Sequence, residues 1–283
     1  MEPRIPMMHP HELLRQWRGK LRTARWGYRG WFEWRGCRVF APAGALLMHE
    51  VAVHGDFEDS TIQALAAYSR PGGVAIDVGA NIGLISLAAL RAEKDLVVHA
   101  FEPSPNVLDY LRRTREMSGF SERWTIHASA CADQSGKAEF CLAAPAQGAY
   151  DGLRETGRVG IVRRVSVPVV RLDDEWAVWG KPGIDWIKID VEGAEAGVFL
   201  GMESIVRICR PVIVSEWNLV NLAAYRTDPQ WLFSFAAQNR YRIFDPATLV
   251  RIESVEFVRM MLHCGRDTLL LVPYERLESE SHA

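Results

Sequence analysis

A run of glycines beside an acid stands out where the apolar residues 74–78 give way to a second apolar stretch. Residues 77–83 read Asp-Val-Gly-Ala-Asn-Ile-Gly, at the place where a strand would turn into a helix. Glycine lets the backbone approach a ligand closely, and the start of a helix presents free N–H groups. The motif therefore predicts a binding site for a nucleotide-like ligand at this turn.

The spacing of the turn distinguishes between cofactors. A dinucleotide site is typically G-x-G-x-x-G, with the helix aimed at a pyrophosphate. Here Gly79, Asn81 and Gly83 are spaced G-x-N-x-G, and Asp77 stands just before them. S-adenosylmethionine (SAM) has no phosphate, but its amino-acid end offers an ammonium to such an acid and a carboxylate to backbone N–H groups. The motif therefore predicts SAM as the cofactor, and a tight turn capped by Asn81 is the simpler alternative.

Glu102 follows a second apolar run, Val97–Phe101, one strand–helix–strand step after the glycines. An acid at this place in a nucleotide-binding sheet accepts hydrogen bonds from both ribose hydroxyls. A surface acid at the start of a helix is the alternative, because the helix dipole also favours a carboxylate there. With the glycine turn upstream, we favour ribose binding.

A third group of acids lies in residues 185–193, Asp-Trp-Ile-Lys-Ile-Asp-Val-Glu-Gly. In a strand, Lys188 and Asp190 point to the same face, and Asp190 lies at the carboxyl end, where ligands of an open parallel sheet bind. There Asp190 or Glu192 can take a proton from an acceptor hydroxyl, or hold a metal ion that lowers the pKa of the hydroxyl. A buried Lys188–Asp190 pair that only stabilises the fold is the alternative. Glu216 ends a later run at the same edge and is a weaker candidate for contact with substrate or metal.

Other chemistries find no support in the sequence. There is no G-x-S-x-G turn, no G-x-x-x-x-G-K-[ST] phosphate loop and no H-E-x-x-H motif, and we assign no metal site. The net charge of −2 gives no overall attraction to nucleic acid or to an anionic membrane. The five scattered cysteines are typical of reduced thiols. Neither a signal peptide nor a membrane span is recognisable, so we expect a soluble, cytoplasmic protein.

The elements that would position these residues alternate between strand and helix from residue 74 onward, which is typical of a Rossmann-like α/β fold with a mainly parallel sheet. Upstream of it, two strand-like runs precede an acidic turn and a helix. Strands are expected at 37–40, 46–53, 74–78, 97–101, 124–128, 138–143, 163–170, 184–189, 211–215, 241–244 and 268–272. Helices are expected at 13–26, 60–68, 82–90, 104–118 and 193–200, and from Asp228-Pro229 onward.

The first 35 residues differ from the rest of the chain. Residues 1–30 contain seven lysines and arginines against two glutamates, interleaved with tryptophans. Residues 13–26 could form a basic amphipathic helix that lies on a lipid surface or covers a lipid-linked substrate. A helix packed on the domain by its tryptophans is the simpler alternative, which we favour.

Taken together, these motifs resemble the FkbM-type family of SAM-dependent methyltransferases. The resemblance covers residues 57–273 and rests on residues 76–83, 101–103, 169–173, 187–195 and Arg210-Pro211. It implies a class I methyltransferase fold, with a seven-stranded, mainly parallel sheet, one antiparallel strand near the edge, and helices on both faces. It places the methyltransferase domain at 57–283, after a basic, tryptophan-rich extension and lead-in at 1–56.

The resemblance also assigns roles to residues. Asp77, Gly79, Asn81, Gly83 and Glu102 match the SAM-binding positions, and Ala132-Asp133 match a segment beside the adenine. Asp190 and Glu192 match the acidic block at the active-site edge, with Lys188 and Glu216 beside it. The implied reaction is O-methylation of a hydroxyl on a sugar, glycan, glycolipid or natural product, which residues 1–35 would help to present.

Two other functions compete with this interpretation. One is an NAD(P)-dependent oxidoreductase on the same fold, which the spacing of the glycines disfavours. The other is a non-catalytic partner protein with a SAM-binding fold, which the acids at both the cofactor and the acceptor edge disfavour. We expect a small-molecule or glycan acceptor and no nucleic acid, and the sequence does not predict the oligomeric state.

Overall fold

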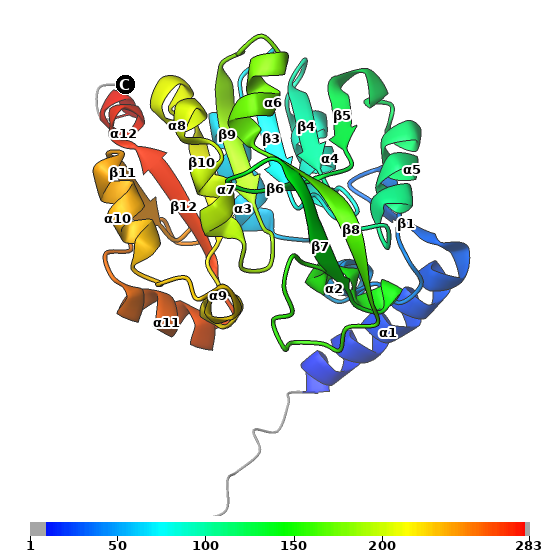
Figure 1. The fold of residues 1–283 in the computed structure, drawn as a ribbon. Helices are drawn as coiled ribbons and strands as arrows, with labels where there is room; N and C mark the ends of the chain where they lie inside the picture. Colours follow the sequence, from blue (N-terminus) through cyan, green and yellow to red (C-terminus); the bar gives the residue numbers. More distant parts are fainter. Residues whose placement is uncertain (1–9, 281–283) are drawn as a thin grey trace, which may run out of the picture.

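The computed structural model describes residues 10–280 of the chain (Figure 1). Expectations for the first nine residues, which include part of the basic extension, lie outside the described residues. At the centre is a seven-stranded sheet with the order β11-β12-β10-β9-β3-β4-β5. Strand β12 is antiparallel to both of its neighbours, and the other neighbouring pairs are parallel. The seven strands are β3 (Val74–Val78), β4 (Val97–Phe101), β5 (Trp124–His127), β9 (Ile184–Ile189), β10 (Val212–Glu216), β11 (Tyr241–Phe244) and β12 (Thr268–Pro273).

Alternate residues of the strands supply two separate hydrophobic cores, one on each face of the sheet. On β3, Ala75 packs with the core on one face, whereas Ile76 packs with the core on the other. This period of two is the pattern expected of a sheet covered on both sides. The first face is covered by α2 (Leu46–His54), α3 (Asp59–Tyr68), α4 (Leu84–Ala92) and α5 (Leu108–Ser118). The second is covered by α6 (Leu172–Val178), α7 (Glu195–Leu200), α8 (Glu203–Cys209), α9 (Leu219–Tyr225), α10 (Trp231–Gln238) and α11 (Val255–His263).

The N-terminal part of the chain packs into the same core as the sheet. After α1 (Pro10–Arg29), the hairpin of β1 (Trp31–Trp34) and β2 (Cys37–Phe40) contributes Phe32 and Val39, which are fully buried against residues of α4 and α5. Residues 31–54 are thus a structural part of the domain that follows them. A short helix, α12 (Tyr274–Glu280), ends the described chain.

A second, three-stranded sheet lies over the carboxyl ends of the central strands (Figure 1). It has the order β6-β8-β7, with β6 (Ala130–Cys131), β7 (Gly136–Leu142) and β8 (Arg163–Val170). Strands β7 and β8 form an antiparallel pair, and the chain between them includes a 3-10 turn, Pro145–Tyr150. This layer forms a roof over the edge at which the acids were expected.

The structure corrects two expectations about secondary structure. Residues 46–53 form the helix α2 and not a strand. The helix buries Met48 and Val51 in the core on one face of the sheet, whereas Glu50 lines the pocket described below. Apolar runs of this length fit a buried strand and a buried helix equally well. Helix α5 begins at Leu108 and not at Ser104, because a turn that Ser104 holds comes first. The sequence analysis also missed the strands β1 and β6 and the helices α6, α8, α9, α11 and α12.

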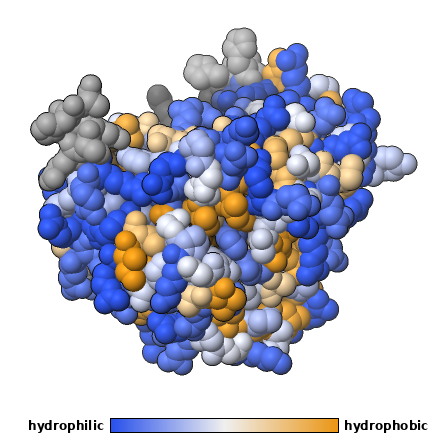
Figure 2. Space-filling view, turned by 90° about the horizontal axis from the view of Figure 1, so that it is seen from above, coloured by the Kyte–Doolittle hydropathy of each residue, from blue (hydrophilic) through white to orange (hydrophobic). Residues whose placement is uncertain are grey.

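Within residues 10–280, no helix combines the length and the apolar character that crossing a membrane requires. Figure 2 shows the end of the molecule opposite to the roof, where hydrophilic residues cover most of the surface and apolar residues form scattered groups.

Candidate active site

A pocket of about 260 Å³ opens at the carboxyl ends of β3, β4, β9 and β10. Such a volume approaches the roughly 300–1,000 Å³ of a typical small-molecule site. Helix α2 and the start of α3 close one side, and the segment between β7 and β8 closes the other. The predicted site residues Gly79, Asn81, Glu102, Lys188, Asp190, Glu192 and Glu216 all line it. The pocket therefore unites the cofactor motif and the acidic edge that the sequence placed far apart.

The glycine turn has a conformation and surroundings that a side chain would disrupt. Gly79 has φ +79°, and a Cβ there would lie 1.8 Å from the carbonyl oxygen of Asp190 on the neighbouring strand segment. Gly83 has φ +89°, and a Cβ there would meet Leu111 and Trp124 at 2.6–2.8 Å. Gly79 thus lets two strand ends meet at the pocket, whereas Gly83 lets α4 pack against α5 and β5.

The N–H groups of this turn are already occupied by acceptors within the protein. Gly79 and Ala80 both donate to the carbonyl of Phe101 at 3.0 Å, and Gly83 donates to Ala80 at 2.8 Å. Asn81 donates to Glu102 Oε2 at 2.8 Å, and its own Oδ1 accepts from the N–H of Ile82 at 2.9 Å. The backbone N–H groups that were expected to bind a ligand carboxylate are therefore already hydrogen-bonded within the protein. The turn does not offer the free N–H groups that the sequence predicted.

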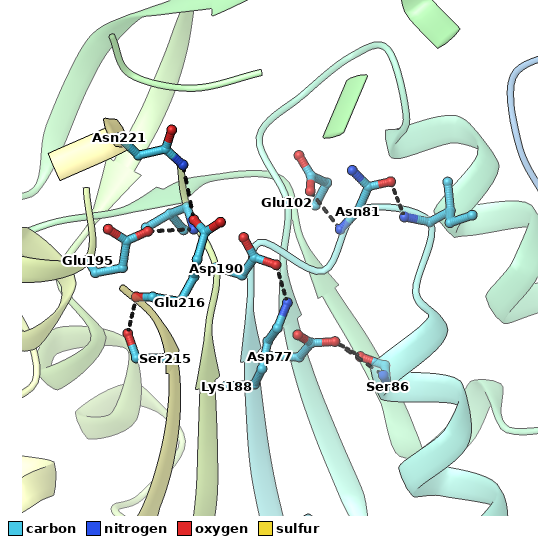
Figure 3. A network of polar contacts seen from close by, with 12 residues as sticks. Asp77, Asn81, Ser86, Glu102, Lys188, Asp190, Glu195, Ser215, Glu216 and Asn221 are labelled. Atoms are coloured by element: carbon cyan, nitrogen blue, oxygen red, sulfur yellow. Dashed lines mark hydrogen bonds and ion pairs between the residues drawn. The ribbon is translucent and has the colours of Figure 1, made fainter. Parts of the chain in front are cut away.

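Glu102 connects the glycine turn, to which it is bonded in Figure 3, with the roof. Its two oxygens accept from the N–H groups of Asn81 at 2.8 Å and Ser104 at 2.7 Å. The Ser104 hydroxyl donates to Asp151 at 2.5 Å, and Asp151 also lines the pocket. Burial raises the pKa of Glu102 to about 7, although the two backbone donors oppose the shift.

Asp77 lies beneath the pocket and is not part of its wall. It is fully buried, and its Oδ2 accepts from the N–H of Ser86 at 3.2 Å and from its hydroxyl at 2.6 Å. Its Oδ1 has no hydrogen-bond partner among the described residues. Burial raises the pKa of Asp77, although the cation of Lys188 opposes this. Asp77 thus anchors the first turn of α4 below the glycines.

Lys188 interacts with both the fully buried Asp77 and the half-buried Asp190. Its Nζ donates to Asp190 Oδ2 at 2.9 Å, as the same-face placement predicted (Figure 3). Burial opposes the charged form, but the carboxylates of Asp190, Glu58 and Asp77 outweigh it and raise the pKa of Lys188. Lys188 is therefore a permanent cation, and the surrounding carboxylates hold it in place near the end of β9.

The carboxylates of Asp190, Glu192 and Glu216 converge on one point of the pocket, with oxygens within 4.8 Å of one another. Asn221, fully buried on α9, donates to Glu192 at 2.9 Å and to Glu216 at 3.3 Å. Burial, with Asp190 nearby, raises the pKa of Glu192 to about 8 and raises that of Glu216 as well. This carboxylate cluster can accept protons near neutral pH, hold a cation, or bind hydroxyl groups.

Among the further pocket residues that escaped the sequence analysis are Glu58, Asp151, Arg158 and Asp267. Arg158 lies 3.1 Å from Glu192 and over the ring of Tyr150 at 4.5 Å, so it covers the carboxylate cluster from the roof. Glu58 carries a buried Oε2 without a partner among the described residues. The acidic turn at 56–59 and the glycine-rich segment at 148–160 were the available signals, but nothing in the sequence placed them at this pocket.

Besides Asp77, two predicted cofactor residues lie outside the pocket wall. Gly83 is behind the turn, where it serves packing. Asp133 is exposed, just after β6, and the wall beside it is formed by Ser129, Ala130 and Cys131.

The family described as the methyltransferase FkbM domain matches residues 77–265, two thirds of the chain and the whole of this pocket's sheet edge. The chain belongs to the FkbM methyltransferase family. As a member it is a SAM-dependent methyltransferase.

Two curated relatives give a measure of the similarity. The 31-O-demethyl-FK506 methyltransferase FkbM of Streptomyces tacrolimicus is 29% identical over 198 residues, covering 57% of this chain and 74% of that protein. The 2-O-methyltransferase NoeI of Sinorhizobium fredii is 28% identical over 155 residues, covering 49% of this chain and 61% of that protein.

Among solved structures, the methyltransferase FkbM of Methylobacillus flagellatus KT is 15% identical, with a TM-score of 0.44, and the match covers 79% of this chain and 52% of that one. An O-methyltransferase of Bacillus cereus in complex with SAH is 13% identical, with a TM-score of 0.42, and the match covers 77% of this chain and 82% of that one.

Proposed function

We propose that this FkbM-family methyltransferase transfers the methyl group of SAM to a hydroxyl of a sugar, glycan, glycolipid or related natural product. The observation that carries the proposal is the convergence of the Asp190, Glu192 and Glu216 carboxylates in the same pocket as the glycine turn. O-methylation needs an acceptor oxygen held in line with the methyl group and a base for its proton. The carboxylate cluster can supply both.

The acids of the pocket suit the cationic groups of SAM. Its ammonium would meet Glu58, whose Oε2 is buried without a partner among the described residues. Its ribose would donate to Glu102, because each carboxylate oxygen there has accepted one hydrogen bond and can accept a second. Its adenine would lie toward Ser129–Cys131, beneath the roof. The residues of the pocket therefore fit the cofactor. Asp77 and Gly83 would act indirectly, by supporting the glycine turn, and Asp133 lies outside the pocket wall.

SAM supplies an electrophilic methyl group on a positively charged sulfur. Asp190 is best placed to receive the acceptor proton, since its Oδ1 is free within the described residues while Oδ2 is held by Lys188. The lysine fixes the carboxylate in one orientation, which favours the geometry of proton transfer. Glu192 and Glu216, with Asn221 between them, would hold neighbouring hydroxyls of the acceptor or share its proton.

The polarity of the acceptor side supports a hydroxyl-rich substrate. This side is bordered by Arg158 and by four acids: Asp190, Glu192, Glu216 and Asp267. Such groups can form hydrogen bonds to several hydroxyls at once. The two curated relatives carry O-methyltransferase names, one for a natural product and one for a 2-O position, which agrees with this substrate class.

The test has two parts. Calorimetry should give binding of S-adenosylhomocysteine (SAH), and no binding of NAD. Extracts incubated with the enzyme and methyl-labelled SAM should then carry label in the glycan or small-molecule fraction, and the wild-type protein should be compared with Asp190→Asn. Label found only in protein or nucleic acid would refute the acceptor class.

A further inference from the structure

Helix α1 carries an apolar stripe that faces away from the rest of the molecule. Leu14, Trp17, Leu21 and Tyr28 are spaced at three, four and seven residues, so they fall on one side of the helix. Their side chains are strongly exposed, at 45%, 60%, 53% and 96%. Single exposed apolar residues are ordinary, but a continuous stripe along a helix indicates a surface with a partner.

The opposite side of α1 is the one that holds the helix to the protein. Gly19 is buried against Val53 of α2, where a Cβ on Gly19 would lie 2.3 Å from the valine side chain. The hydroxyl of Thr23 pairs with His49 of α2 at 3.1 Å, and the ring of Trp26 stacks on Phe32 at 5.2 Å. Because the helix is fixed by these contacts, the apolar stripe is presented to the outside.

Cations border the stripe along its full length. Residues 10–29 contain one glutamate and six exposed cations: Arg15, Arg18, Lys20, Arg22, Arg25 and Arg29. The helix thus carries +5 and the chain −2, so the remaining residues carry −7. Within the described residues, Arg18, Lys20, Arg22 and Arg25 have no carboxylate at ion-pair distance. A partner that is apolar in its interior and anionic at its surface would match both features of this face.

We propose that α1 docks the protein on an anionic lipid surface, with the helix axis parallel to the membrane. The apolar stripe would enter the boundary between headgroups and acyl chains, while the cations contact lipid phosphates. Helix α1 lies next to α2 at the end of the molecule to which the parallel strands run (Figure 1), and α2 provides Leu46, Leu47 and Glu50 to the pocket wall. Docking through α1 therefore brings the active site to the lipid surface.

The test is cosedimentation of the full chain with two kinds of vesicle, phosphatidylcholine alone and phosphatidylcholine with phosphatidylglycerol. We expect binding to the anionic vesicles that weakens at high salt, and at least about tenfold less binding to the neutral ones. The double variant Trp17→Glu, Leu21→Glu should lower partition into anionic vesicles by on the order of tenfold or more. The double variant Arg18→Gln, Arg22→Gln should lower it by a similar factor and reduce the dependence on salt.

A matched control uses two apolar residues of other helices that are at least comparably exposed. Val178→Glu on α6 and Ile208→Glu on α8, which are 81% and 58% exposed, should leave vesicle binding unchanged. Thermal unfolding of each variant confirms that it is folded. Absence of binding to anionic vesicles at low salt overturns the proposal, as does binding that the α1 variants do not alter. A wild-type dimer that Trp17→Glu, Leu21→Glu converts to a monomer without any vesicle binding also overturns it, in favour of a second copy as the partner.

Discussion

The side chain of Glu102 accepts a hydrogen bond of 2.8 Å from the backbone N–H of Asn81, so the acid at the end of β4 holds the glycine turn at the end of β3. Its second oxygen holds the N–H of Ser104, whose hydroxyl is bonded to Asp151 in the roof. One residue thus fixes three walls of the pocket. The same carboxylate still has lone pairs for two ribose hydroxyls.

The first prediction concerns this residue. Glu102→Ala should lower the affinity for SAH by on the order of tenfold to a hundredfold, because charged hydrogen bonds contribute about 1.5–3 kcal/mol. From the sequence alone, little loss of stability is expected, but the variant also leaves two N–H groups without their acceptor, so the free energy of unfolding should fall too. Calorimetry and urea unfolding measure the two effects. The exposed Glu122→Ala should change neither, and unchanged SAH affinity in Glu102→Ala would make Glu102 a purely structural acid.

The second prediction distinguishes two reasons for a glycine at position 79: its left-handed backbone conformation and its close approach to the Asp190 carbonyl. Gly79 and Gly180 have similar φ angles of +79° and +83°, but a Cβ on Gly180 meets nothing within 4 Å, whereas one on Gly79 lies 1.8 Å from the Asp190 carbonyl. Gly180→Ala should cost about 1–2 kcal/mol of stability, which is the strain of the left-handed conformation. Gly79→Ala must also separate β3 from the end of β9, so it should cost more and abolish SAH binding. Equal loss of stability in the two variants, measured by urea unfolding, would refute the role of close approach.

The third prediction assigns the proton acceptor. Asp190→Asn preserves the hydrogen bond from Lys188 at 2.9 Å, so the pocket should keep its shape and its affinity for SAH. Turnover should fall by on the order of a hundredfold or more, the usual contribution of a general base. Single-turnover methyl transfer measures this step. Normal turnover in Asp190→Asn would move the role to Glu192 or Glu216.

Much of this site could be predicted because it follows the regular part of the sheet. Each parallel strand ends at the same edge, so an acid directly after an apolar run, such as Glu102 or Asp190, had to reach it. Arg158 and Asp151 could not be placed in this way, because they lie in the segment between β7 and β8, whose path depends on the roof and not on a periodic pattern. Glu58 escaped for a related reason: residues 46–53 were interpreted as a strand, so the following turn was not expected beside Lys188.

The N-terminal tryptophans show that the composition of a segment does not predict which of its side chains are exposed. Of the four tryptophans in residues 1–35 (Trp17, Trp26, Trp31 and Trp34), Trp34 is 3% exposed, and Trp26 is stacked on Phe32. Trp31 lies beneath Arg29 and Arg38, which leaves Trp17 as the strongly exposed one. Removal of residues 1–35 to test acceptor binding would therefore also remove core side chains, and substitutions on α1 are the sharper experiment.

The fourth prediction follows from the raised pKa values of three buried acids. Glu102 and Glu195 have pKa values of about 7 and Glu192 of about 8, mainly because of burial, against an ordinary value of 4.5. Between these values the folded state binds more protons than the unfolded state, so stability is lost as pH rises. The free energy of unfolding without cofactor should fall between about pH 5 and pH 8, by up to about 1.4 kcal/mol per pH unit for each acid.

Glu195→Gln tests this origin directly. Glu195 is fully buried, and its Oε1 accepts from the N–H groups of Val191 and Gly193, which a glutamine oxygen can replace. The variant should have a shallower dependence of stability on pH than the wild type. An exposed substitution such as Glu139→Gln should leave the slope unchanged. A free energy of unfolding that is constant or rises over this pH range would refute the conclusion that ionisation of these buried acids destabilises the fold.

The last prediction concerns a metal ion at the carboxylate cluster. The oxygens of Asp190, Glu192 and Glu216 are close enough to share a cation, within 4.8 Å, and a divalent ion there could lower the pKa of an acceptor hydroxyl. However, Glu192 is already neutralised by Arg158 at 3.1 Å, and Asp190 by Lys188 at 2.9 Å. Since these side-chain cations compensate two of the three carboxylates, we expect the reaction to proceed without a metal.

Turnover should therefore be unchanged after dialysis against EDTA and unaffected by added Mg²⁺. A matched variant makes the experiment decisive: Arg158→Gln removes the cation that faces Glu192, so the cluster should then gain affinity for Mg²⁺, measured by calorimetry in the absence of substrate. Loss of wild-type activity in EDTA, restored by Mg²⁺, would overturn the prediction and make Asp190, Glu192 and Glu216 metal ligands. In that case Arg158 would be a competitor that must move aside when the ion binds, and Arg158→Gln should lower the concentration of Mg²⁺ needed for half-maximal activity.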